Sequence, residues 1–132
     1  MKKDNLDGLP MGAWVWDQSA GILTCDGVEF GRGYSGNKEG KNNPLLQGVK
    51  GVGPIPRGDW MITEMYDSAN VGPYALKLEP CEGTKTMGRS AFRIHGDSIK
   101  LPGEASHGCI ILPRPVRLKI WQSGNRHLRV VE

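Results

Sequence analysis

Glycine and proline interrupt this chain so often that short strands are favoured over long helices. Its 132 residues include 19 glycines and 9 prolines, which separate short apolar runs. Such punctuation is typical of an all-β domain with loops rather than of a helical bundle. Residues 59–65 and 74–79 also alternate between apolar and polar side chains, as strands with one buried face do. The chain therefore predicts a mainly β fold.

The same patterns predict seven strands and one helix. The strands are expected at 13–16 and 21–25, which form a hairpin, from Val28 onward, and at 59–65, 74–79, 91–95 and 127–131. The helix is expected over 113–121, because proline stands in its first turn and Gly124 follows its last apolar position. Residues 31–56 are rich in Gly, Asn, Ser and Lys and predict a long loop with a binding role.

We therefore expect a compact β-sandwich or barrel-like domain with one short helix near the C-terminus. A chain of this length can bury one core, so residues 1–132 are predicted to form a single domain. The core is expected to contain the four tryptophans, Trp14, Trp16, Trp60 and Trp121.

Charge and hydropathy exclude some classes of partner. The net charge is +3, and the basic residues are scattered apart from 126–129, so no nucleic-acid stripe is expected, and His127 is predicted to lie on the surface. Residues 1–16 contain no apolar run that could form a signal-peptide core. No window has the apolar length that a bilayer requires, so membrane insertion is not expected. These features predict a protein made in the cytoplasm, or exported without a cleavable signal.

The three cysteines, Cys25, Cys81 and Cys109, contain no C-x-x-C pair, so a structural zinc site is not expected. Two alternatives remain open for the first two. They form a disulfide that leaves Cys109 free, or each is a small buried hydrophobic residue.

The stretch Ser106-His107-Gly108-Cys109 combines a thiol, an imidazole and flexible backbone. A thiol becomes a nucleophile when an imidazole takes its proton. His95 is the favoured base, because it ends an apolar run that a return segment can bring beside Cys109, whereas His107 is a candidate to orient the site. The backbone N–H groups of His107, Gly108 and Cys109 are predicted to form an oxyanion hole.

Other polar residues near these motifs have several interpretations. Asp97 is a candidate to orient an imidazole, to contact the ammonium group of a substrate, or to cap the turn after Gly96. Ser106 either donates to His95 or begins the turn. Tyr34, Ser35 and Gly36 lie in the glycine-rich loop and are predicted to contact substrate. That loop lacks the Lys-Ser/Thr ending of a phosphate loop, so nucleotide binding is not predicted.

The order His, spacer, Ser-His-Gly-Cys resembles the catalytic signature of the L,D-transpeptidases, cysteine enzymes of peptidoglycan. The wider pattern is similar to the compact branch that type VI secretion delivers as interbacterial toxins. It comprises residues 33–36, 42–44, 53–58, 94–97 and 108–111. Two departures stand out. The spacer before Ser106 is short, and Ile111 stands where housekeeping members usually carry Asn or Arg, a polar contact that Arg114 is expected to replace.

The resemblance implies a function as well as a fold. Cys109 would be the nucleophile and His95 the base, with a backbone carbonyl in place of a third side chain and with no metal or organic cofactor. The substrate would be tetrapeptide stems of peptidoglycan, handled by L,D-carboxypeptidase and L,D-transpeptidase chemistry with D-amino acid exchange. The enzyme would be secreted into the periplasm of a target bacterium, and its partners would be a secretion-machine component and a cognate immunity protein. The alternatives are a housekeeping cell-wall enzyme, an ordinary cysteine peptidase and a noncatalytic peptidoglycan-binding module.

Overall fold

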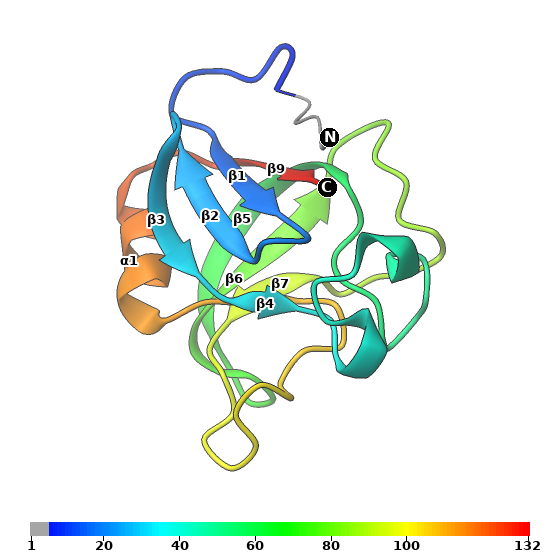
Figure 1. Cartoon of the computed structure of the whole chain (residues 1–132). Coiled ribbons are helices and arrows are strands. Elements are labelled where there is room, and N and C mark those ends of the chain that lie inside the picture. The colour runs from blue at the N-terminus through cyan, green and yellow to red at the C-terminus, as the bar shows by residue number, and fades with distance from the viewer. Residues whose placement is uncertain (1–5) are drawn as a thin grey trace.

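The computed structural model describes residues 6–132, which form one mixed sheet of nine strands (Figure 1). The strands are β1 (Trp14–Asp17), β2 (Ile22–Cys25), β3 (Val28–Arg32), β4 (Tyr34–Ser35), β5 (Gly58–Ser68), β6 (Gly72–Pro80), β7 (Arg93–His95), β8 (Ile110–Ile111) and β9 (His127–Val131). Two 3-10 turns, η1 (Lys38–Gly40) and η2 (Pro44–Leu46), and the helix α1 (Arg114–Gln122) complete the described part of the chain. The predicted mainly β fold with one short helix near the C-terminus is confirmed.

The two edges of the sheet are consecutive in the chain. The strand order is β3-β2-β1-β9-β5-β6-β7-β8-β4, yet only Gly33 separates β3 from β4. The sheet therefore curls until its edges meet (Figure 1). A Cβ at Gly33 would lie 1.7 Å from the carbonyl oxygen of Ile111, so this junction has no room for a side chain. Within residues 6–132 no ladder joins β3 to β4, so the sheet is barrel-like but open.

The predicted strands are present with shifted ends. The hairpin of β1 and β2 is confirmed by antiparallel pairing, with Trp14 opposite Cys25. β5 and β6 are longer than their alternating patterns, because backbone pairing between them continues beyond the alternation, as far as the pair Ser68 and Gly72. β4 lies inside the predicted loop and pairs with β8. Neither strand was predicted, because a strand of two residues has no detectable period.

The core fills the concave side of the curled sheet. Trp14, Trp16 and Trp60 are buried, as predicted, and Trp60 packs edge-on against Phe92 with ring centroids 5.0 Å apart. Trp121 is only partly buried, so the expectation of four core tryptophans is wrong for this residue. It lies near the end of α1, where the helix meets solvent.

Helix α1 packs against β6 and β7, and its Ile120 is buried in the core. Its Val116 covers β3 at Gly31, where an added Cβ would lie 2.9 Å from the valine side chain. Arg117 is buried and donates to the carbonyl groups of Pro73, Tyr74 and Leu112, which ties the helix to the start of β6 and to the segment after β8. Among residues 6–132, no helix combines the length and apolar character needed to cross a bilayer.

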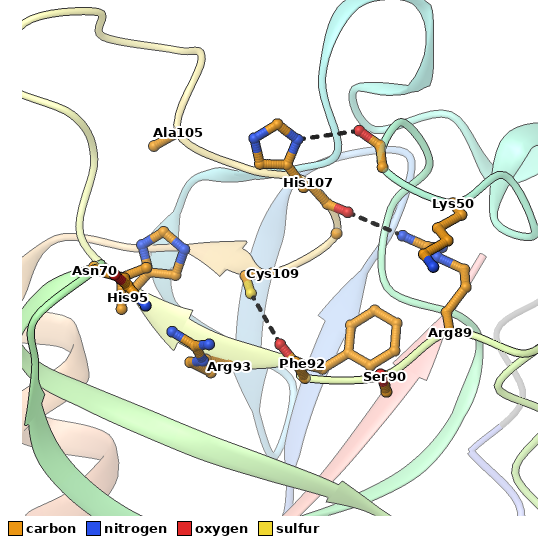
Figure 2. A pocket seen from close by; sticks show the side chains of 14 residues that line it. Lys50, Asn70, Arg89, Ser90, Phe92, Arg93, His95, Ala105, His107 and Cys109 are labelled. Atoms are coloured by element: carbon orange, nitrogen blue, oxygen red, sulfur yellow. Dashed lines mark hydrogen bonds between the residues drawn. The ribbon is translucent and has the colours of Figure 1, made fainter.

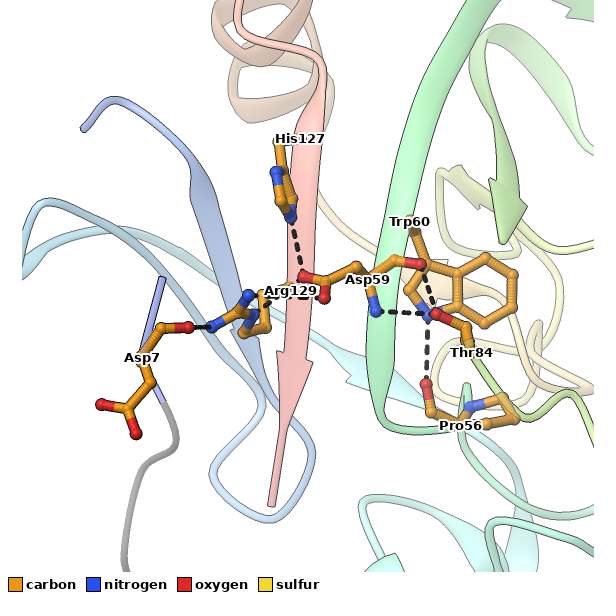
Figure 3. A network of polar contacts seen from close by, with 7 residues as sticks. All are labelled: Asp7, Pro56, Asp59, Trp60, Thr84, His127 and Arg129. Atoms are coloured by element: carbon orange, nitrogen blue, oxygen red, sulfur yellow. Dashed lines mark hydrogen bonds and ion pairs between the residues drawn. The ribbon is translucent and has the colours of Figure 1, made fainter. Parts of the chain in front are cut away.

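A polar network ties β5 to β9 (Figure 3). Arg129 donates to both carboxylate oxygens of Asp59, at 2.8 and 3.3 Å, and His127 Nε2 lies 2.7 Å from the same carboxylate. Arg129 also donates to the carbonyl oxygen of Asp7, 2.6 Å away. His127 is therefore part of a half-buried ion-pair network rather than the isolated surface residue that was expected.

Candidate active site

Strands β7 and β8 bring His95 and Cys109 to one side of the sheet. The strands run parallel, with Ile94 opposite Ile110. Both isoleucines point into the core, so His95 and Cys109, each one residue away, face the opposite side. By this register Cys109 lies beside Arg93, diagonally across from His95.

Both side chains line a cavity of about 320 Å³ (Figure 2). The rest of its wall comes from the loop before β5, the turn between β5 and β6, the segment leading into β7, and the turn before β8. These lining residues are Lys50, Gly51, Asn70, Val71, Arg89, Ser90, Ala91, Phe92, Arg93, Ala105, His107 and Gly108.

Cys109 holds its proton in the free protein. Its half-buried thiol donates to the carbonyl oxygen of Ala91, 3.7 Å away. Burial raises the pKa of the Cys109 thiol, and the backbone N–H of Arg93 and the charges of Arg93 and Arg89 oppose that rise only in part. A base is therefore needed to form the thiolate.

His95 has the protonation state that a base requires. It is 3 % exposed, and its Nδ1 lies 2.8 Å from the carbonyl oxygen of Gly96. A carbonyl oxygen can only accept, so Nδ1 carries the proton and Nε2 has the free lone pair. Burial lowers the pKa of His95, and the charges of Arg93 and Arg117 lower it further. The imidazole is thus neutral near pH 7. Within residues 6–132 no hydrogen bond joins it directly to Cys109.

Ser106 organises the turn that presents Cys109. Its buried hydroxyl accepts from the backbone N–H of Gly36 and of Gly108, at 2.9 and 3.1 Å, and donates to the carbonyl of Cys109 at 2.6 Å. The hydroxyl has no contact with His95, so the second of its two predicted roles is the one seen. Because the Gly108 N–H is already used, it does not belong to the predicted oxyanion hole. His107 and Cys109 are the remaining predicted donors.

Gly108 sits in a space that only glycine fits. Its φ is +135°, and an added Cβ would lie 2.4 Å from Nη2 of Arg89. Beneath the turn, the fully buried Ser35 donates to the Gly108 carbonyl at 2.9 Å and accepts from the N–H of Ile55 at 2.9 Å. Ser35 and Gly36 therefore lie under the turn and do not line the cavity, because β4 pairs with β8. The predicted substrate contact of these two residues becomes a supporting role.

His107 is exposed at the cavity, and its ring is held from the loop before β5. Asn37 donates its two amide hydrogens to the carbonyls of Gly51 and Ser106, at 2.7 and 2.8 Å. His107 Nδ1 lies 3.2 Å from the Gly51 carbonyl and donates to it. His107 thus closes the wall of the cavity formed by this loop, and its Nε2 is left for solvent or a ligand.

Asp97 caps the turn after β7. Its carboxylate accepts from the hydroxyl of Tyr34 at 2.6 Å and from the backbone N–H groups of Ser98 and Gly103, at 2.8 and 3.1 Å. Burial and the bond to Asp97 raise the pKa of Tyr34 to about 12. This arrangement matches the capping role among the three alternatives for Asp97, since the His95 ring pairs with a backbone carbonyl instead.

Arg114 lies away from the Cys109 cavity. With Tyr34 and Asp97 it lines a different cavity of about 340 Å³ beside α1. Its guanidinium lies over the ring of Tyr74, 4.9 Å from the centroid. Ile111 lines this same cavity, so Arg114 lies near Ile111, and both lie outside the cavity of Cys109. That Arg114 replaces the polar contact missing at Ile111 stays a prediction.

Three site residues escaped the sequence interpretation. Arg93 stands two residues before His95, and this spacing within a strand could have placed both on one face. Asn37 and Arg89 lie in irregular segments without any period, so nothing in the sequence connects them to Cys109. Among residues 6–132 all three cysteines are free, so Cys25 and Cys81 do not pair.

Comparison with known families places this geometry in context. The model of the Tlde1 domain matches residues 30–132, from β3 to the C-terminus, whereas a comparison with curated proteins finds no match. Tlde1 domains are type VI secretion effectors that modify peptidoglycan with L,D-transpeptidase activity. Because the match takes in most of the chain, including both strands that carry the thiol and the imidazole, this chain belongs to the Tlde1 domain family.

Proposed function

We propose that this chain is a cysteine-dependent L,D-carboxypeptidase and L,D-transpeptidase acting on the tetrapeptide stems of peptidoglycan. The observation that carries the proposal is that Cys109 shares a cavity with a neutral His95, whose tautomer is set by the Gly96 carbonyl. Membership of the Tlde1 domain family supports the substrate class.

The first half-reaction forms a thioester. His95 Nε2 accepts the thiol proton as the sulfur of Cys109 attacks the carbonyl carbon of the third stem residue, meso-diaminopimelate. The C–N bond to the terminal D-alanine breaks, and the imidazolium returns its proton to the leaving amine. Both side chains line the same cavity, in which the scissile bond and the leaving amine would lie.

The second half-reaction decides the product. Water gives a shortened stem, the L,D-carboxypeptidase outcome. A D-amino acid gives exchange, and the amine of a neighbouring stem gives a cross-link. In each case His95 accepts a proton from the attacking group and returns it to the Cys109 sulfur as the thioester breaks. The backbone N–H groups of His107 and Cys109 are the proposed donors to the oxyanion of both steps.

The proposed place of action is the periplasm of a target bacterium, which the enzyme reaches through type VI secretion. A cognate immunity protein in the producer and a component of the secretion machine are the proposed partners. An effector of this kind would trim the wall of a competitor rather than build the wall of its producer.

Purified muropeptides test the reaction. Incubation with tetrapeptide stems should yield tripeptide stems and, with added D-methionine, exchanged stems, both read by mass spectrometry. Pentapeptide stems should react far more slowly. Cys109→Ala should abolish turnover, whereas Cys81→Ala, which removes a thiol outside the cavity, should keep it. Turnover retained in Cys109→Ala would contradict the mechanism.

A double variant tests whether the two residues act as a unit. Cys109→Ala, His95→Ala and the combination of both should lose similar activity, because losses within one catalytic unit do not add. If the double variant were far slower than either single one, His95 would not be the base. Binding of muropeptides without any turnover by the unchanged protein would instead favour a noncatalytic module.

A further inference from the structure

Arg89 is a buried cation with neutral partners. It is 6 % exposed, and its guanidinium donates to backbone carbonyls of the loop before β5 and of the turn before β8. These are the carbonyls of Gln47, Gly53 at 2.9 Å, Pro54 at 2.8 Å and His107 at 3.2 Å. In the described part of the chain no carboxylate pairs with it. Burying a charge without a counter-charge costs free energy, because the charge loses its hydration. A neutral donor would bind these carbonyls at a lower desolvation cost.

The guanidinium lies against the turn that carries Cys109, and Arg89 lines the same cavity as the thiol. Its Nη2 is only 2.4 Å from where a Cβ of Gly108 would be, and its central carbon is 5.2 Å from the centroid of the Phe92 ring. Figure 2 shows Arg89 approaching the backbone of His107, in the turn that leads to Cys109. Any negative charge that forms on the sulfur therefore arises close to this unpaired cation.

Other charged and titratable groups also face Cys109. Arg93 approaches from β7, and His95 lies at the end of the same strand. Lys50 and His107 line the opposite part of the cavity. Of these groups, Arg89 and Arg93 act against burial to lower the pKa of the thiol. Arg89 differs from Arg93 in that it also bonds the turn itself.

We propose that Arg89 is a positioning residue for Cys109: it holds the turn 106–109 in place and supplies the counter-charge for the thiolate that forms during attack. This inference rests on the proposed role of Cys109 as nucleophile. It explains why an arginine, rather than a neutral amide, binds these carbonyls. In the free protein the thiol is neutral and Arg89 has no acidic partner in the described part of the chain. When the sulfur becomes anionic, the thiolate takes the place of that partner.

Arg117 offers a matched control. It is 4 % exposed, it also donates to three backbone carbonyls, and no carboxylate pairs with it in residues 6–132. Its guanidinium packs against Gly96, beside His95, whereas Arg89 packs against Gly108, beside Cys109. Loss of either arginine removes a buried cation with several bonds, but only Arg89 contacts the turn that carries the thiol.

The test measures the pH dependence of Cys109 alkylation by iodoacetamide in a Cys25→Ala/Cys81→Ala background. Arg89→Met should raise the midpoint of the reaction by about one pH unit, the size of shift that one nearby charge produces. Arg89→Lys, which keeps the charge, should restore most of the original midpoint. Arg117→Met should leave it unchanged. Should Arg89→Met fail to fold, Arg89→Gln replaces it, because glutamine keeps an amide donor but has no charge. Its alkylation midpoint is then compared with those of the unchanged protein and Arg89→Lys.

An unchanged midpoint in folded Arg89→Met or Arg89→Gln would overturn the proposal and leave Arg89 a purely structural residue. A midpoint that rises equally in Arg117→Met would also overturn it, because the effect would then follow general loss of packing. The alkylation needs no peptidoglycan. Absence of muropeptide turnover in the unchanged protein would therefore refute the proposed function separately from this inference.

Discussion

Cys109 and His95 have opposite pKa shifts with a shared cause. Burial disfavours the charged form of each group, so it raises the pKa of the thiol and lowers that of the imidazole. The resting site is consequently a neutral thiol beside a neutral imidazole. In the proposed mechanism, proton transfer accompanies attack on the substrate, at the moment when the surrounding cations can stabilise the new negative charge.

The lowered pKa of His95 predicts the acid limb of the pH profile. The limb of kcat/KM should lie below pH 6.5, the ordinary value for histidine, because His95 must be neutral to act as the base. Arg117→Met should move the limb to higher pH, since it removes a charge that disfavours the imidazolium.

The lowered pKa of His95 also affects the stability of the fold. The unfolded chain protonates first, so the stability that neutral His95 contributes is lost as the pH falls from about 6.5 toward its folded pKa.

Steady-state kinetics with a tetrapeptide muropeptide between pH 4.5 and 8 would measure this limb. A limb at or above pH 6.5 in the unchanged protein would contradict the prediction. A limb that stays in place in Arg117→Met would show that the charge of Arg117 does not lower the pKa of His95.

The turn 106–109 positions the Cys109 thiol in the candidate site. It is bonded from three directions, by Ser35 of β4, by Gly36 just after that strand, and by Arg89 from the loop before β7. None of these contacts is local in sequence. The position of the thiol therefore depends on the pairing of β4 with β8 and on a buried guanidinium.

Gly108→Ala should damage this element more than an equivalent change elsewhere. The added Cβ would meet Arg89, and overpacking of this kind costs about 1–3 kcal/mol. Activity should also fall by roughly 100-fold, because small displacements of a nucleophile are that costly. Gly83→Ala is the control, since Gly83 also has positive φ, +90°, but an added Cβ there meets nothing within 4 Å. Urea denaturation and muropeptide turnover measure the two effects. Equal losses in both variants would mean that backbone strain, and not the contact with Arg89, is responsible.

At the scale of the whole molecule, the curled sheet depends on β9. This C-terminal strand lies between β1 and β5, parallel to the first and antiparallel to the second. It therefore joins the N-terminal hairpin to the strands that lead to the site. The network of Asp59, His127 and Arg129 reinforces this junction from outside the core (Figure 3).

Asp59→Asn should weaken that junction. Burial opposes ionisation of Asp59, but hydrogen bonds from Arg129 and His127 outweigh it and lower its pKa. The stabilisation is therefore present above about pH 4, the ordinary value for aspartate, and is lost as the pH falls through the lower folded pKa. At pH 7 we expect a loss of about 1 kcal/mol, since partial exposure screens the pair. Urea denaturation at pH 7 and pH 3 should show a smaller difference from the unchanged protein at pH 3 than at pH 7.

Glu29→Gln is the matched control for Asp59→Asn, because Glu29 pairs with Arg32 on the exposed surface of β3. It should leave stability at pH 7 nearly unchanged. Similar losses in the two variants would show that net charge, rather than the β5–β9 junction, determines the effect.

The proposed site of action predicts where the enzyme is toxic. Its substrate lies outside the cytoplasmic membrane, so expression in the cytoplasm of a Gram-negative cell should be harmless. Attachment of a cleavable export signal should cause swelling or lysis, and Cys109→Ala should abolish it. Growth curves and microscopy measure both outcomes. Toxicity from cytoplasmic expression alone, or from the exported Cys109→Ala protein, would count against the effector proposal.

Local pattern was sufficient for much of the architecture. Alternation and turn residues encode strands such as β5 and β6, because side chains on successive positions face opposite sides of a sheet. Proline and glycine marked the ends of α1, with Gly124 in positive φ as a helix end requires. The chemistry of the thiol and imidazole likewise made Cys109 and His95 candidates before any contact was known.

Only the tertiary structure determines which residues surround Cys109 and His95. β4 and β8 have two residues each, too few to show a period, yet their pairing buries Ser35 and fixes the turn. The capping role of Asp97 and the position of Arg114 outside the Cys109 cavity follow from where the chain turns after β7 and β8. Arg89 became part of the site only through carbonyls from distant segments. A sequence pattern reports the environment along one element, whereas these roles depend on packing between segments up to 73 residues apart.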